Sequence, residues 1–306
     1  MKVVVTGASG FIGHNVLLRA PREWTIYAVY HATPGLEAFV NEHRLTNVTP
    51  VKCNLLSEAD VQGLARTIGA RPDAMLYLAA NGDPAASAER PRWDLESNTV
   101  AFVNTLEHCP AEHVVYLSSG AVYDGLHGAV TPSTAVSPKL PYAISKLASE
   151  QYLQFFCERR GRVSSYVNVR FFGAYGPYEA ERKITTKWLR ALARGEREFV
   201  IRGDGRNLID FMYVDDAVEG LLTLIRRRGE RLTLDFASGA PVSINDIVTT
   251  MGAALGVKVA IRHEGVVPEY IEFRSADTTM RDRFGISPAI TFADGLTRLS
   301  AFLGRS

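Results

Sequence analysis

The chain has 306 residues, of which 46% are hydrophobic, and carries 34 basic and 33 acidic side chains for a formal net charge of +1. This length suits one α/β unit with a small appendage and is enough to bury a sizeable core. The balanced charge gives no reason to expect nucleic acid or an anionic membrane as a partner, and we expect neither. No apolar run reaches the roughly 18 residues that a membrane-spanning helix needs.

Three cysteines, Cys53, Cys109 and Cys157, lie far apart and form no metal-ligand pair. We expect buried free thiols, no metal site and a reducing, cytoplasmic location. A predicted strand begins at residue 2, so we expect no signal peptide.

Strand-like and helical segments alternate over the first 170 residues. The predicted strands cover 2–6, 24–30, 48–52, 73–78, 112–117 and 163–169, and the predicted helices cover 11–20, 57–69, 96–108 and 142–159. This alternation predicts an α/β fold with a Rossmann-type, doubly wound parallel sheet covered on both faces. Beyond residue 170 the pattern is mixed, with helices at 184–194, 214–227 and 292–302, strands at 232–236 and 257–261, and a helix capped by Ser243 that reaches Leu255.

A glycine-rich turn at residues 6–13 follows the first strand and opens the first helix. Gly7 allows a tight turn, Gly10 lets the backbone approach a pyrophosphate, and Gly13 lets the helix pack close to the strand. The helix N-terminus offers free N–H groups and a partial positive charge to phosphates. A plain strand–helix turn is the alternative, but a second apolar run from 24 to 30 follows, as a βαβ unit requires.

Tyr142 and Lys146 stand one helical turn apart in the segment that Pro141 opens. A phenol has a pKa of about 10, and a neighbouring ammonium or an oxidised nicotinamide ring favours the phenolate. Such a tyrosine can act as a general acid or base near neutral pH. A surface Tyr–Lys pair without chemistry is the alternative.

Ser119 follows the buried strand at 112–117, where a doubly wound sheet binds its ligands. Its hydroxyl would be free to bond a substrate oxygen. A serine-rich turn with no chemical role is the alternative.

These motifs, in this order, resemble the extended short-chain dehydrogenase/reductase family, in particular its NAD-dependent epimerase/dehydratase branch. The resemblance rests on segments 6–13, 78–80, 117–123, 170–177, 203–205 and 210–216, on Asn98, and on Tyr142 with Lys146. It implies an NAD- or NADP-dependent enzyme that acts on a nucleotide-linked sugar, with Tyr142 as acid/base, Lys146 on the nicotinamide ribose and Ser119 orienting the reacting oxygen.

The resemblance also implies a domain division and a set of ligand contacts. Residues 1–170 would form the dinucleotide-binding Rossmann domain, with segments of about 205–236 returning to it, and 171–306 mainly a small C-terminal substrate-binding subdomain. The expected cofactor contacts are Gly7, Ser9, Gly10, Phe11, Ile12, Gly13, His31, Asn54, Leu55, Ala79, Ala80, Asn98, Tyr142 and Lys146. The expected substrate contacts are Ser119, Ala121, Gly173, Arg202 and Arg274.

Two departures from the family pattern concern the cofactor. His31 stands where NAD-preferring members carry an aspartate that bonds the ribose hydroxyls. Loss of that acid removes repulsion against a 2′-phosphate, and His31 or Thr33 could contact one, so we expect a slight preference for NADP. Asn54 replaces a common aspartate near the adenine and keeps an acceptor oxygen.

Other departures concern the substrate. Gly173 replaces an asparagine, and Ile209 replaces an arginine that grips the nucleotide diphosphate in relatives. An alkyl group cannot replace a bidentate cation. Either Arg202, Arg206, Arg274 or Lys183 supplies the charge, or the substrate does not carry a diphosphate in the usual pose. Among these we favour Arg274. Gly120 and Ala121 stand where dehydratases carry an acid pair, which argues against 4,6-dehydration.

We therefore interpret the chain as an NAD(P)-dependent epimerase or ketoreductase acting on a nucleotide-activated sugar, and expect a homodimer. The motifs do not separate the two reactions. The alternatives are an oxidoreductase acting on a non-sugar alcohol or ketone, and a non-catalytic redox sensor that binds a dinucleotide.

Overall fold

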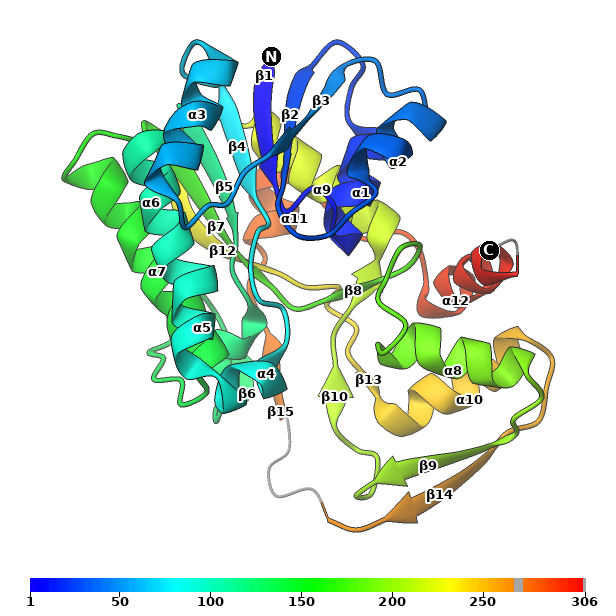
Figure 1. Ribbon diagram of the computed structural model, residues 1–306. Coiled ribbons are helices and arrows are strands. Elements are labelled where there is room, and N and C mark those ends of the chain that lie inside the picture. The colour runs from blue at the N-terminus through cyan, green and yellow to red at the C-terminus, as the bar shows by residue number, and fades with distance from the viewer. Residues whose placement is uncertain (267–271, 305–306) are drawn as a thin grey trace.

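A computed structural model describes residues 1–266 and 272–304. Its centre is a parallel sheet of seven strands in the order β12-β7-β5-β4-β1-β2-β3 (Figure 1). The strands are β1 (Lys2–Thr6), β2 (Thr25–Tyr30), β3 (Val48–Lys52), β4 (Ala74–Tyr77), β5 (His113–Leu117), β7 (Ser165–Phe171) and β12 (Arg231–Phe236). The expected Rossmann-type sheet is therefore confirmed, and its strand order reverses between β1 and β4.

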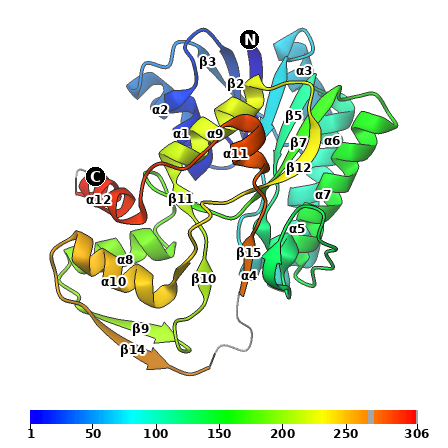
Figure 2. The same ribbon diagram turned by 180° about the vertical axis from the view of Figure 1, so that it is seen from behind.

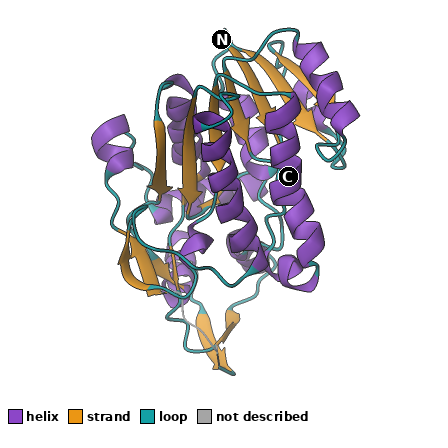
Figure 3. Cartoon of the chain, turned by 90° about the vertical axis from the view of Figure 1, so that its left-hand side faces the viewer, coloured by secondary structure: helices purple, strands orange, loops and turns teal. Residues whose placement is uncertain are grey.

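Helices cover both faces of this sheet (Figures 2 and 3). One face carries α1 (Phe11–Arg19), α2 (Leu36–Glu42), α9 (Val214–Arg226) and α11 (Thr279–Phe284), and the other carries α3 (Glu58–Ile68), α6 (Ala101–His108) and α7 (Pro141–Glu158). Each face buries its own apolar cluster, which explains why β4 is buried along its whole length.

The C-terminal lobe holds a third apolar cluster beneath the sheet. It is built from α8 (Ile184–Ala193), α10 (Ile244–Ala254), α12 (Phe292–Leu303), the parallel pair β9 (Glu198–Arg202) and β14 (Ala260–Glu264), and the antiparallel pair β10 (Leu208–Ile209) and β13 (Val242–Ser243). Ser243 caps α10 as expected, in a capping box with Asp246. The strand expected at 257–261 lies three residues later, at β14.

Short elements connect the two lobes. β8 (Ala174–Tyr175) pairs with β11 (Met212–Tyr213), and β6 (His127–Val130) pairs with β15 (Glu272–Ser275). The chain thus returns to the Rossmann lobe at α9 and β12 and again at β15 and α11.

The helix expected at 96–108 is longer and composite. It begins with α5 (Pro91–Leu95), continues through a π-helical segment η1 (Glu96–Val100), and ends as α6. A separate short helix, α4 (Pro84–Glu89), precedes it, with Arg90 as its C-cap. A single-turn π segment is often found at a functional site.

Candidate active site

The glycine turn has the geometry that the sequence predicts. Gly7 has a φ of +65°, and a Cβ there would lie 2.8 Å from the backbone nitrogen of Ala79. A Cβ on Gly13 would lie 2.5 Å from the carbonyl oxygen of Gly7. Gly10 caps α1 without a side-chain cap, and the first turn holds no acid, so its N–H groups suit a phosphate.

A cleft of about 480 Å³ opens beside this turn, along the carboxyl ends of β1, β2 and β4. Seven expected cofactor contacts line it: Gly7, Ser9, His31, Asn54, Leu55, Ala79 and Ala80. Sequence reasoning did not single out Tyr30, Asn81, Gly82, Trp93 and Ser97, which also line it. The size and the glycine cradle fit a dinucleotide, for which Gly10, Phe11, Ile12 and Gly13 provide the adjacent helix N-terminus.

Charged groups of both signs surround the adenosine end of this cleft. His31 is exposed. Hydrogen bonds from the backbone of Asn54 and from Ser57 lower the pKa of the nearby Asp60, and His31 lowers it to a smaller extent. Tyr30 donates a hydrogen bond to Glu37. This hydrogen bond lowers the pKa of Glu37, and the charge of Lys52 lowers it to a smaller extent. The side chain of Asn54 accepts a hydrogen bond from the backbone of Leu56 (3.1 Å), which fixes the loop after β3.

Tyr142 lies in the first turn of α7, close to Ser119. Burial raises the pKa of the Tyr142 phenol, a hydrogen bond with Ser119 lowers it, and the charge of Asp94 raises it again. The lowered pKa expected from the Tyr142–Lys146 spacing is therefore not produced by the protein's own groups. Ser119 caps the 3₁₀ turn η2 (Gly120–Tyr123), where its Oγ accepts the N–H of Ala121 at 3.1 Å.

Lys146 is buried beneath the same site, with 4% of its surface exposed. Its Nζ donates to the carbonyl oxygen of Leu117 (2.9 Å) and lies 5.2 and 5.9 Å from the ring centroids of Tyr116 and Tyr142. Burial lowers the pKa of Lys146 to about 8, while the charges of Asp94 and Glu150 oppose this shift. The structure thus brings Ser119, Tyr142 and Lys146 together at the end of β5.

Asn98 lies behind the cleft, in η1. Its Oδ1 accepts the backbone N–H of Asn81 (2.6 Å), and its Nδ2 donates to Asp94 (2.9 Å) and Ser145 (3.0 Å). The Asn98 side chain is thus used to hold Asn81, which lines the cleft. Direct contact of Asn98 with a cofactor stays a prediction.

The expected substrate contacts are spread over a wider region. A Cβ on Gly120 would lie 3.0 Å from the Phe172 ring, so an acid there would displace this ring. A Cβ on Gly173 would lie 3.3 Å from both the carbonyl oxygen of Asp210 and Cβ of Phe211, which disfavours the family's asparagine. Ile209 lies on β10 and packs against the apolar cluster of the C-terminal lobe.

The candidate cations are exposed. Arg274 lies on β15 opposite Ala129 of β6, Arg202 ends β9, and Arg206 forms an ion pair with Asp204 at 3.6 Å. Lys183 caps the N-terminus of α8. Their roles toward a substrate stay predictions.

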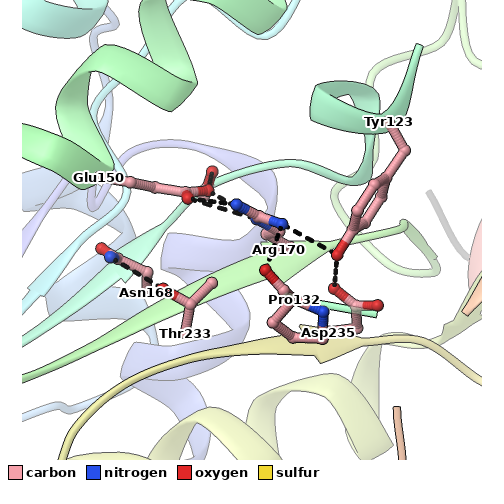
Figure 4. A network of polar contacts seen from close by, with 8 residues as sticks. Tyr123, Pro132, Glu150, Asn168, Arg170, Thr233 and Asp235 are labelled. Atoms are coloured by element: carbon pink, nitrogen blue, oxygen red, sulfur yellow. Dashed lines mark hydrogen bonds and ion pairs between the residues drawn. The ribbon is translucent and has the colours of Figure 1, made fainter. Parts of the chain in front are cut away.

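A buried polar network supports the site from behind (Figure 4). Glu150 of α7 pairs with Arg170 of β7 (2.9 Å) and accepts a hydrogen bond from Ser118. Arg170 also donates to the Tyr123 hydroxyl (3.0 Å), which donates to Asp235 (2.7 Å). This network was not predicted, because its members lie in separate motifs and meet only in the folded chain.

Two further findings concern residues 1–266 and 272–304. No helix there is both long enough and apolar enough to cross a bilayer. No group of three or more His, Cys, Asp or Glu side chains there is arranged to hold a metal ion.

Comparison with known proteins extends these observations. The model of the NAD-dependent epimerase/dehydratase family matches residues 3–233. The chain is 27% identical to UDP-glucose 4-epimerase of Mycolicibacterium smegmatis, over 99% of this chain and 98% of that protein. It is also 27% identical to UDP-glucuronate 4-epimerase 2 of Arabidopsis thaliana, over 97% of this chain and 74% of that protein.

Solved structures agree. MoeE5 in complex with UDP-glucose and NAD superimposes with a TM-score of 0.85 and 26% identity, covering 100% of this chain and 99% of that chain. UDP-glucose 4-epimerase of Thermotoga maritima, at 22% identity, shares the fold with a TM-score of 0.88, covering 100% of this chain and 99% of that chain.

Proposed function

Because the chain belongs to the NAD-dependent epimerase/dehydratase family, we propose that it is an epimerase that inverts a carbon of a UDP-linked hexose. The observation that carries this proposal is the meeting of Ser119, Tyr142 and Lys146 beside a dinucleotide-sized cleft. A relative of which 98% is covered is named UDP-glucose 4-epimerase, so we propose C4 as the reacting carbon.

We propose the following roles for the side chains of the site. Bound NAD would supply a hydride acceptor and a positive charge beside the reacting carbon. Ser119 would hold the sugar hydroxyl, and Tyr142 would take its proton and later return it to the keto oxygen. Lys146 would hold the nicotinamide ribose, and the positive charge of the bound nicotinamide would favour the phenolate form of Tyr142, whose pKa the protein's own groups raise.

Gly120 and Ala121 favour epimerisation over dehydration. Elimination of water needs an acid and a base beside the sugar, and neither residue carries an ionisable group. A ketoreductase remains the second candidate, because it shares the first proton and hydride transfer.

The test is a direct assay with UDP-glucose and with UDP-glucuronate in the presence of NAD, with the C4 epimers resolved by NMR. We expect one of them to epimerise, and Tyr142→Phe to cut turnover by about 10²–10⁴-fold while dinucleotide binding is kept, because only the phenol oxygen is lost. Tyr27→Phe, which makes the same change on β2, is the matched control. Near wild-type turnover of Tyr142→Phe would contradict the assignment of the acid/base.

We further propose that the cleft accepts NADP as well as NAD, with a slight preference for NADP. His31 and Thr33 line the adenosine end, and no carboxylate occupies position 31. The nearby acids Glu37 and Asp60 each accept a hydrogen bond from a neighbour, from Tyr30 and from Ser57.

We also propose a homodimer. Apart from Trp93, which lines the cleft, five exposed large apolar side chains lie on the adjacent elements α5, η1 and α7: Leu95, Val100, Ile144, Tyr152 and Phe155. On α7 they fall at positions i, i+8 and i+11, on one side of the helix. A two-fold dimer would bury this patch against its own copy.

We also propose a cytoplasmic location. All three cysteines are buried and free, as expected for a reducing compartment.

A further inference from the structure

Asp94 is a buried carboxylate in contact with the helix that carries Tyr142 and Lys146. It lies in α5 with none of its surface exposed. Three groups in the described part of the chain donate to it: the Asn81 amide (2.7 Å), the Asn98 amide (2.9 Å) and the Ser145 hydroxyl (2.8 Å). None of these donors is a cation. A buried charge is costly without a counter-charge, so its electrostatic partner must lie close by.

Lys146 is a buried cation in the same region, and among the residues that the structure describes it lacks a directly bonded anion. Its Nζ donates to a carbonyl oxygen, and no carboxylate within residues 1–266 and 272–304 forms an ion pair with it. The titratable groups that face it are Tyr116 of β5, Tyr142 and Glu150 of α7, and Asp94 of α5.

Glu150 is a poor counter-charge for Lys146, because it already has a partner. Both of its oxygens accept hydrogen bonds from Arg170, at 2.9 and 3.2 Å, and both side chains are buried (Figure 4). The Glu150–Arg170 pair is neutral as a unit. The remaining uncompensated charges near the site are therefore the carboxylate of Asp94 and the ammonium of Lys146.

The contacts of Asp94 also reach the catalytic helix itself. Ser145 lies between Tyr142 and Lys146 in sequence, and its Oγ bonds both Asp94 and the carbonyl oxygen of Tyr142 (2.9 Å). Asn98 bridges the same Asp94 carboxylate to Ser145 and to the backbone of Asn81, which lines the cleft.

We propose that Asp94 is the counter-charge of Lys146 and that, through Ser145, it fixes the helical turn that carries Tyr142 and Lys146. Asp94 is thus a positioning residue that acts on the reaction through these two groups. Its carboxylate keeps Lys146 protonated in spite of burial and opposes ionisation of Tyr142. Removal of the charge should lower the pKa of both groups together.

The direct test is the titration of Lys146 by NMR in protein with isotope-labelled lysine, without dinucleotide or substrate. The chain has seven lysines, and a Lys146→Met variant assigns the signal. In Asp94→Asn, which keeps the size of the side chain, we expect the pKa of Lys146 to fall from about 8 by about 1 or more, as for loss of an opposite charge a few ångströms away. Asp282→Asn, which removes an exposed charge on α11, should leave it unchanged. An unaltered pKa of Lys146 in Asp94→Asn overturns the proposal.

A second variant keeps the test decisive if Asp94→Asn does not fold. Glu150→Gln/Arg170→Met removes the neutral pair as a unit and should change the pKa of Lys146 little. A fall as large as that expected for Asp94→Asn would make Glu150 the counter-charge instead.

The pH–rate profile separates the effect of the Asp94 charge from the effect of its contact with the helix through Ser145. In Asp94→Asn both limbs of the pH–rate profile should move to lower pH, because Tyr142 and Lys146 both lose their protons more easily. Ser145→Ala keeps the charge but removes the link to the helix, and should lower turnover without moving the profile. The inference uses the catalytic roles of the proposed function, but the NMR titration involves no substrate, so the two can fail separately.

Discussion

At the scale of single residues, the sequence predicts that Lys146 lies beside Tyr142 but not how the surrounding groups change the pKa of Tyr142. Lys146 was found from its spacing to Tyr142, and the structure places it beneath the phenol. The Tyr142 pKa is nevertheless raised by burial and by Asp94. Spacing alone does not reveal burial, so the sign of the shift could not be read from the sequence.

The substrate diphosphate needs a cation to replace the arginine lost at Ile209. Arg274 is exposed on β15, and Arg274→Ala should raise KM for a UDP-sugar severalfold while dinucleotide affinity stays the same. The reason is that two phosphates held without a cation are costly. Steady-state kinetics and calorimetry measure the two effects.

Arg262→Ala on β14 is the matched control, because that arginine is exposed and pairs with Glu198. If KM does not move in Arg274→Ala, then Arg202, Arg206 or Lys183 holds the phosphates, or the substrate carries none.

Cofactor choice at His31 can be tested by direct binding. NADPH should bind at least as well as NADH, because no carboxylate at position 31 repels a 2′-phosphate. Calorimetric titration of both dinucleotides measures this, with His31→Ala as the comparison. A clear preference for NADH would show that another group replaces the lost ribose contact.

At the scale of elements, apolar runs located the central strands to within about two residues, because the inner strands β1, β4, β5 and β7 are buried on both faces. The pair β6–β15 was missed, since β6 buries only Val130 and its partner is far away in sequence. The π-helical segment was missed for a related reason. Its register depends on the contacts of Asp94 and Asn98 with Ser145, which join segments about 50 residues apart and leave no local pattern.

The junction of β12 and β15 should make stability depend on pH. Asp235 accepts hydrogen bonds from Tyr123 (2.7 Å) and Ser275 (2.8 Å), yet burial raises its pKa from 3.8 to about 6. The folded protein therefore binds this proton more tightly than the unfolded chain. The resulting stability is fully present below about pH 4 and is lost as pH rises through 6.

Relative to Asp235→Asn, the free energy of unfolding of the wild type should fall by roughly 3 kcal/mol over that interval. Urea unfolding of both proteins at several pH values measures the difference. A difference that is constant with pH would mean that Asp235 keeps an ordinary pKa.

At the scale of the whole molecule, the two lobes have separate apolar clusters, and the cofactor cleft lies on the Rossmann lobe. The chain crosses between the lobes at β8, β11 and β15, so the candidate cation Arg274 lies on a segment returning to the Rossmann lobe (Figure 2). This arrangement lets the C-terminal lobe change its substrate contacts while the sheet that positions Ser119, Tyr142 and Lys146 is kept.

The exposed apolar patch on α5, η1 and α7 predicts the state of assembly. Phe155 is 44% exposed and lies on the same side of α7 as Ile144 and Tyr152. Phe155→Glu should convert a dimer into monomers, because a buried carboxylate would face its own copy across the two-fold axis. Sedimentation velocity measures the change. Val200→Glu is the matched control, since Val200 is 47% exposed but lies on β9, away from the patch. A wild type that sediments as a monomer at all concentrations would contradict the prediction, and an unchanged dimer in Phe155→Glu would move the interface to another face.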